Sequence, residues 1–114
     1  MYDVVLQSQR AGREAVRQGV EVEAVDKACR DVIAEAGWAD AFLHGTGHGV
    51  GLEIHEGPTL RAASEDVLPV GSVVTVEPGV YVPGLGGVRI EDMVEVTEDG
   101  CRLIGASFRE LLVV

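Results

Sequence analysis

Residues 44–58 constrain the fold of this chain more than any other stretch, because glycine recurs through them at short intervals. The glycines that alternate with other residues are Gly45, Gly47, Gly49 and Gly51. Each glycine costs about 1 kcal/mol in a helix interior relative to alanine, so a helix would lose about 4 kcal/mol here. The window is therefore expected to be extended. An extended chain places His44 and His48 on one face, and His55 joins them only across a twist or bulge.

These three histidines are all that the chain contains, and imidazoles suit metal binding or proton transfer near neutral pH. Taken singly, each is more often an ordinary hydrogen-bonded side chain than a ligand. Taken together, with carboxylates further along the chain, they favour a functional site.

The chain changes character near residue 40. Residues 2–18 are rich in helix formers with apolar side chains near helical spacing, and Gly19 ends that segment. A stronger three- and four-residue repeat predicts a second helix over 25–36, with Gly37 as its C-terminal cap. Apolar and β-branched runs then predict strands over 73–76, 80–82, 88–91, 94–96 and 111–114. Two helices followed by antiparallel strands indicate one α+β domain over 1–114, with the helices covering a sheet.

Composition narrows the class of partner. Nine basic and nineteen acidic residues give a formal charge of -10, which argues against nucleic acid and against an anionic membrane surface. No apolar run is long enough to span a bilayer. Cys29 and Cys101 have no metal-site or disulfide-framework spacing, so we expect free thiols in a cytoplasmic protein.

Glu77 and Glu91 stand out because each follows an apolar run. Glu77 ends the run over 73–76 and precedes Pro78, which restrains it to an extended backbone. In the simplest interpretation Glu77 is a solvated strand end, and Glu91 pairs with Arg89 across water, worth ~0–1 kcal/mol. A buried carboxylate, however, needs a cation or hydrogen-bond donors. One imidazole and two carboxylates suit a divalent ion such as Mn, Co, Fe or Zn.

Three motifs occur in order along the chain: HGTGHGVGLEIHE over 44–56, VEPGVY over 76–81 and GGVRIED over 86–92. Together they resemble the proline-specific metallopeptidases, the prolidase and aminopeptidase P group with the pita-bread fold. The helical segment over 4–37 is also similar to the one that precedes the first motif in that group. The resemblance covers nearly the whole chain and implies the C-terminal half of a pita-bread catalytic domain. The activity it implies is metal-dependent hydrolysis of Xaa-Pro peptide bonds, by a dipeptidase or an aminopeptidase.

The resemblance also implies a ligand set. It assigns His48 as the metal-binding histidine and Glu77 and Glu91 as the metal-binding glutamates, with Glu91 bridging two ions. Mn is the ion it favours first, with Co, Zn or Fe as alternatives. The implied catalytic residues are His55, which matches a histidine that hydrogen-bonds substrate and transition state, and Glu77, which accepts a proton from the nucleophile.

Two further residues complete the expected site. His44 matches a histidine that lines the pocket, and Arg89 matches an arginine near the substrate end. The expected substrate-binding residues are thus His44, His55 and Arg89, and the implied substrate is a proline-containing peptide.

The chain departs from the group in one respect. The two aspartate ligands of the group lie upstream, and the early aspartates of this chain match neither motif: Asp3, Asp26, Asp31 and Asp40. We therefore expect a fragment that binds metal weakly and hydrolyses Xaa-Pro dipeptides poorly or not at all. Exposed sheet edges predict a homo-oligomer. The main alternative is a non-catalytic peptide- or protein-binding module on the same fold, and a small unrelated metal-binding protein is a weaker one.

Overall fold

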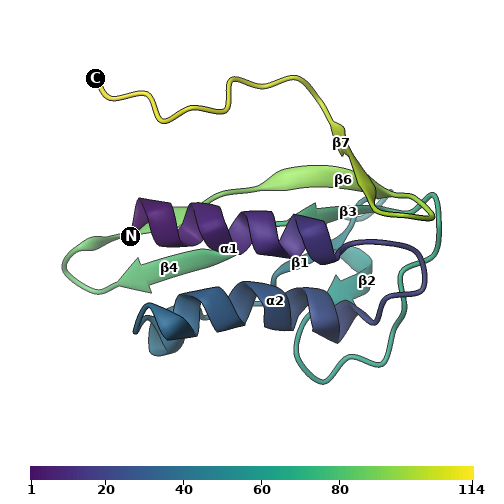
Figure 1. Ribbon diagram of the computed structural model, residues 1–114, viewed down its shortest axis with the longest axis horizontal. Helices are drawn as coiled ribbons and strands as arrows, with labels where there is room; N and C mark the ends of the chain where they lie inside the picture. The colour runs from purple at the N-terminus through teal and green to yellow at the C-terminus, as the bar shows by residue number, and fades with distance from the viewer.

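The computed structural model describes residues 1–114, in which two helices lie side by side over an antiparallel sheet (Figure 1). Helix α1 spans Tyr2–Ala15 and helix α2 spans Val22–Glu35. All strand pairs are antiparallel, which confirms the predicted α+β class. Neither helix has the length and apolar character needed to cross a bilayer.

The two helices end for different reasons. Helix α1 stops before the predicted residue 18, because the backbone of Val16 is extended and its side chain is fully buried in the core. Helix α2 is followed by Gly37 with φ 85°, which confirms the predicted cap. Beyond it, the Trp38 backbone N–H donates to Ile33 O at 3.0 Å, so the chain turns back directly after the helix.

The strands form one main sheet and one separate hairpin. In sheet order the main strands are β2 (Glu56–Leu60), β1 (Gly47–Gly49), β3 (Val73–Val76), β6 (Asp92–Val96) and β7 (Cys101–Ile104). The hairpin consists of β4 (Gly79–Val82) and β5 (Gly86–Arg89), and a short 3-10 turn, η1, covers Ala39–Ala41. The strands predicted over 73–76, 80–82 and 94–96 are confirmed. Of the run predicted over 88–91, only residues 88–89 form a strand, at the end of β5, and residues 90–91 connect β5 to β6.

The predicted strand over 111–114 is wrong. The chain turns immediately after β6, and Cys101 pairs with Val96 to start β7 instead. Strand β7 thereby occupies the free edge of β6, and residues 105–114 run on as an exposed tail without strand structure (Figure 1).

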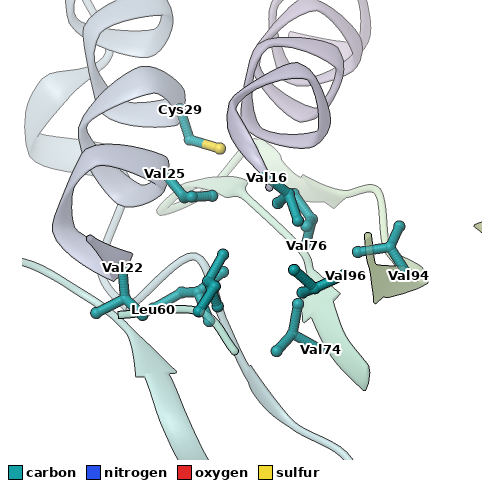
Figure 2. Close-up of a cluster of buried hydrophobic side chains, with 10 residues drawn as sticks. Val16, Val22, Val25, Cys29, Leu60, Val74, Val76, Val94 and Val96 are labelled. Carbon is teal, nitrogen blue, oxygen red and sulfur yellow. The ribbon is translucent and has the colours of Figure 1, made fainter. Parts of the chain in front are cut away.

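The main core lies between the helices and the sheet, and valine dominates it. Figure 2 shows side chains from α2 facing those of β3 and β6 across this space. The buried members are Val16, Val22, Val25, Cys29, Leu60, Leu68, Val74, Val76, Val94 and Val96. A second, smaller cluster joins the hairpin to the helices through Val5, Ile33, Phe42 and Val80. Because these clusters join the helices to the main sheet and to the hairpin, β1, which carries His48, and β3, which directly precedes Glu77, rest on a fixed support.

Candidate functional site

A bulge in β1 brings two of the histidines together. Strand β1 pairs with β2 through His48 and Thr59, and the register shifts between His48 and Gly49. The bulge expected from the glycines is therefore confirmed. The imidazole rings of His48 and His55 lie with their centroids 4.6 Å apart in an edge-to-face arrangement.

Close strand packing explains the glycines on either side of His48. A Cβ atom on Gly47 would lie 1.8 Å from Thr75 O, and one on Gly49 would lie 2.1 Å from Gly57 O. The neighbouring strands thus approach the β1 backbone within a distance that only glycine permits. The backbone of β1 is therefore packed tightly against its neighbours on both sides of His48, at Gly47 and at Gly49, and this fixes the position of His48.

His48 and Glu77 form the closest pair of site residues. The Nε2 atom of His48 lies 3.2 Å from Oε1 of Glu77, and each side chain is only 17% exposed. The Thr75 hydroxyl donates to Oε1 of Glu77 at 2.9 Å and accepts the His48 backbone N–H at 3.1 Å. Arg89 approaches the other oxygen, with Nε 3.7 Å from Oε2 of Glu77. Strand β3, through Thr75, therefore fixes both members of the pair.

The protonation of His48 follows from its second ring nitrogen. Nδ1 lies 2.8 Å from Gly49 O, and because a carbonyl only accepts, Nδ1 carries the proton. In neutral imidazole this leaves Nε2 with a lone pair, directed at a carboxylate oxygen of Glu77. His48 Nε2 and Glu77 Oε1 are then two acceptors that face each other, an arrangement that a cation or a shared proton between them would stabilise. The pair therefore fits a divalent metal as a partial ligand set.

Glu91 does not join this pair. It lies exposed between β5 and β6, and the chain contains no group of three His, Cys, Asp or Glu side chains placed to hold a metal ion. The expected convergence of His48, Glu77 and Glu91 is thus not seen. Like charges repel, and the cation that acts on both carboxylates in this chain is Arg89. The pKa of Arg89 is raised, first by its hydrogen bond and attraction to Tyr81 and then by Glu77 and Glu91.

His44 also lines the cavity and is held by a residue that the sequence motifs left without a role, Tyr81. Its Nδ1 donates to Gly45 O at 2.8 Å, so its Nε2 accepts the hydroxyl proton of Tyr81 at 2.7 Å. Arg89 Nη1 in turn donates to the Tyr81 oxygen at 3.5 Å. Tyr81 thus connects two expected substrate-binding residues. Gly87 lies opposite Tyr81 in the hairpin, and both Gly87 and Gly79 leave room for the Tyr81 side chain, because a Cβ atom at either position would lie 2.7 Å from it.

These residues surround one open cavity of about 740 Å³ that no apolar side chain lines. Its walls include five of the six residues expected at the site, namely His44, His48, His55, Glu77 and Arg89. The lining residues that sequence reasoning missed are Glu53, Glu56, Thr59 and Arg61, all from β2 and the segments beside it. With histidines, carboxylates and arginines on its walls, the cavity suits a charged or strongly polar ligand.

Comparison with known proteins points to one family. The sequence profile of metallopeptidase family M24 matches residues 1–98. The Xaa-Pro dipeptidase of Pyrococcus furiosus is 47% identical over 112 residues, which are 98% of this chain and 32% of that protein. The probable dipeptidase PepE of Mycobacterium tuberculosis is 50% identical over 113 residues, which are 99% of this chain and 30% of that protein.

Solved structures agree with the sequence comparison. The Xaa-Pro dipeptidase from Bacillus anthracis superposes with a TM-score of 0.96 at 47% identity, over 99% of this chain and 32% of that chain. The prolidase from Pyrococcus furiosus gives a TM-score of 0.91 at 46% identity. The half pita-bread architecture expected from the motifs is thereby confirmed as the fold of these neighbours. The chain spans about a third of the length of the curated relatives it matches.

Proposed function

We propose that this chain, which belongs to metallopeptidase family M24, supplies the His48–Glu77 part of a metal-dependent site for the hydrolysis of Xaa-Pro peptide bonds. The observation that carries the proposal is the approach of His48 Nε2 to Glu77 Oε1 at 3.2 Å, with the Nδ1 proton committed to Gly49 O. The names of the relatives support the substrate class, because those proteins are described as Xaa-Pro dipeptidases or prolidases.

The residues that would hold the metal are His48, Glu77 and Glu91. His48 and Glu77 already face each other, and Glu91 follows β5 at the same end of the hairpin that carries Arg89. We propose Mn as the ion, with Co, Zn or Fe as alternatives, and two ions in the intact enzyme. When bound, a divalent ion supplies an acidified water and polarises the scissile carbonyl.

Each remaining residue has a role that its position allows. Glu77 accepts a proton at the oxygen that also receives the Thr75 hydroxyl. His55, exposed at the cavity wall beside His48, donates a hydrogen bond to the substrate carbonyl oxygen as negative charge develops on it. His44 lines the wall and Arg89 binds the carboxylate end of a short peptide.

The isolated chain is proposed to be weakly active or inactive, because two facing ligands are fewer than a metal ion requires. The exposed position of Glu91 supports one alternative, a non-catalytic peptide- or protein-binding module that uses the same cavity. The two functions differ at His48. Under the peptidase proposal His48→Ala abolishes metal binding, and under the module proposal it leaves partner binding unaltered.

The location, the partner class and the oligomeric state of the protein are proposed from its cysteines, its charge and its exposed apolar residues. Cys29 and Cys101 are both free, which supports a reducing, cytoplasmic location. The charge of -10 supports a peptide rather than a nucleic acid or a membrane as the partner.

Leu52 and Ile54 beside the cavity are 105% and 86% exposed, which supports self-association into a homo-oligomer. Sedimentation that gives a monomer mass across the micromolar range would contradict the oligomer.

Calorimetry with Mn²⁺ and an Ala-Pro hydrolysis assay test the proposed function together. We expect weak Mn²⁺ binding by the chain, abolished in His48→Ala and retained in Gln7→Ala, a control at an exposed position of α1. We expect little or no turnover of Ala-Pro by the chain alone. Unchanged Mn²⁺ binding in His48→Ala would overturn the assigned ligand, and turnover at ordinary enzyme rates would overturn the view that the chain is catalytically incomplete.

A further inference from the structure

A buried carboxylate on α2, Asp26, takes no part in the proposed chemistry. It is 1% exposed, and both of its oxygens are engaged. Oδ1 accepts the Thr46 backbone N–H at 3.0 Å and the Thr46 hydroxyl at 2.9 Å. Oδ2 accepts the Arg30 Nε–H at 2.6 Å. A charged group in such a place is costly unless every partner is present, and an apolar side chain would fill the same space. Asp26 therefore has a role other than filling space, and that role depends on the residues that its partners, Arg30 and Thr46, hold in place.

The first partner, Arg30, holds the segment that carries His44. Its Nη1 donates to Phe42 O at 3.2 Å and its Nη2 donates to His44 O at 2.5 Å. The guanidinium also lies over the Phe42 ring, 4.2 Å from the centroid. Asp26 orients this guanidinium through Nε, so the backbone of residues 42–44 is fixed from helix α2.

The second partner, Thr46, holds Glu77. The Thr46 carbonyl accepts the Glu77 backbone N–H at 2.6 Å, and the Thr46 N–H is shared between Asp26 Oδ1 and Leu60 O. Thr46 is fully buried and lies two residues before His48. The same carboxylate is therefore connected to Glu77 through a single residue, Thr46, and to His44 through one guanidinium.

We propose that Asp26 is a positioning residue of the site: its two oxygens fix Thr46 and Arg30, and through them the backbone positions of Glu77 and His44. The importance of this for catalysis rests on the proposed function, whereas the positioning itself does not. Asp26 touches neither substrate nor metal. It ties two cavity residues from different segments of the chain, His44 before β1 and Glu77 after β3, to the same position on α2.

Two substitutions separate the two connections. Asp26→Ala removes both. Asp26→Asn keeps an oxygen that accepts from Thr46 and replaces the other by an NH₂ group, which opposes the Arg30 Nε–H. Asp31→Asn is the matched control, because Asp31 lies on the same helix in an exposed pair with Lys27. Amide hydrogen exchange at Thr46 and Glu77, and the ¹³C shift of the His44 carbonyl, report the two connections without metal or substrate.

For Asp26→Ala we expect exchange at Thr46 and Glu77 to accelerate about tenfold or more, while the amide of Val94 in β6, an interior strand of the sheet, keeps its rate. For Asp26→Asn we expect the His44 carbonyl shift to change and the Thr46 amide to stay protected. Asp31→Asn should match the unsubstituted chain in every signal.

Equal acceleration at all three amides would overturn the proposal, because it would show a general loss of stability. An unchanged exchange rate at Glu77 in Asp26→Ala, or an unchanged His44 carbonyl shift in Asp26→Asn, would overturn it as well. If Asp26→Ala does not fold, the His44 carbonyl shift in Asp26→Asn alone tests whether Asp26 positions His44 through Arg30. If the unsubstituted chain fails to bind Mn²⁺, that result counts against the proposed function. The exchange rates and the carbonyl shift still test the positioning role, because they need no metal.

Discussion

Arg109 and Asp92 form a two-point ion pair that ties the C-terminal tail to the start of β6. Arg109 Nη1 and Nη2 donate to Oδ1 and Oδ2 of Asp92, each at 2.6 Å. Gln9 of α1 donates to the same carboxylate at 2.7 Å, and Arg13 Nε lies 3.7 Å from it. The C-terminal tail, α1 and β6 therefore meet at the Asp92 side chain, one residue after Glu91.

This carboxylate makes stability depend on acid pH. Burial alone would raise the pKa of Asp92, but hydrogen bonds from Arg109 and Gln9 and the nearby positive charges lower it overall. Because the folded pKa lies below the unfolded value of about 3.9, the stabilisation is complete above that pH. It is lost as the pH falls through the folded pKa.

Arg109→Gln tests this dependence. We expect a loss of about 1 kcal/mol in the free energy of unfolding at pH 7, and a smaller loss once Asp92 is protonated. Urea unfolding at pH 7 and at an acid pH low enough to protonate Asp92 measures the difference. Lys27→Gln, which removes an exposed pair with Asp31, serves as control and should change little. An equal loss at both pH values would contradict the assigned role of the ion pair.

Gly47→Ala is expected to damage the site through the backbone. The added methyl group would meet Thr75 O at 1.8 Å, so β1 and β3 must separate at His48. We expect a destabilisation of about 1–3 kcal/mol and a change in the His48 imidazole signals. Gly100→Ala is the control, since no atom lies within 4 Å of a Cβ there. A Gly47→Ala chain with unaltered stability and unaltered His48 signals would show that the strand spacing is not tight.

The two cysteines are expected to differ in reactivity. Burial raises the pKa of the Cys29 thiol to about 11, so almost none of it is thiolate at pH 8. The pKa of Cys101 is also raised by burial, but that side chain is only half-buried. Iodoacetamide followed by mass spectrometry should therefore label Cys101 well before Cys29 in the folded chain. Equal labelling rates in the folded chain, at the rate seen in urea, would contradict the buried position of Cys29.

Local rules account for much of what the sequence predicted. The glycines around His48 excluded a helix and indicated the bulge that brings His55 close, because both effects depend only on neighbouring residues. The position of Gly37 after α2 follows from its tolerance of positive φ. The error over 111–114 has the opposite origin: strand propensity was present, but β7 had already taken the edge of β6.

Long-range relationships could not be predicted in the same way. Asp26 and Arg30 have the spacing of an ordinary surface pair on a helix, and only the folded chain shows that Asp26 is buried against Thr46. Glu91 lies exposed between β5 and β6 and does not complete a metal-binding group with His48 and Glu77, a placement that no spacing rule expresses.

The most direct test of the central claim is the ¹⁵N spectrum of the imidazole nitrogens during addition of Zn²⁺, a diamagnetic substitute for Mn²⁺. We expect the Nε2 signal of His48 to shift while its Nδ1 keeps the proton donated to Gly49 O. Glu77→Gln should weaken this shift, because the facing carboxylate oxygen is replaced. Zn²⁺ that shifts Nδ1 of His48, or that leaves His48 unchanged while it shifts the other histidines, would contradict the claim.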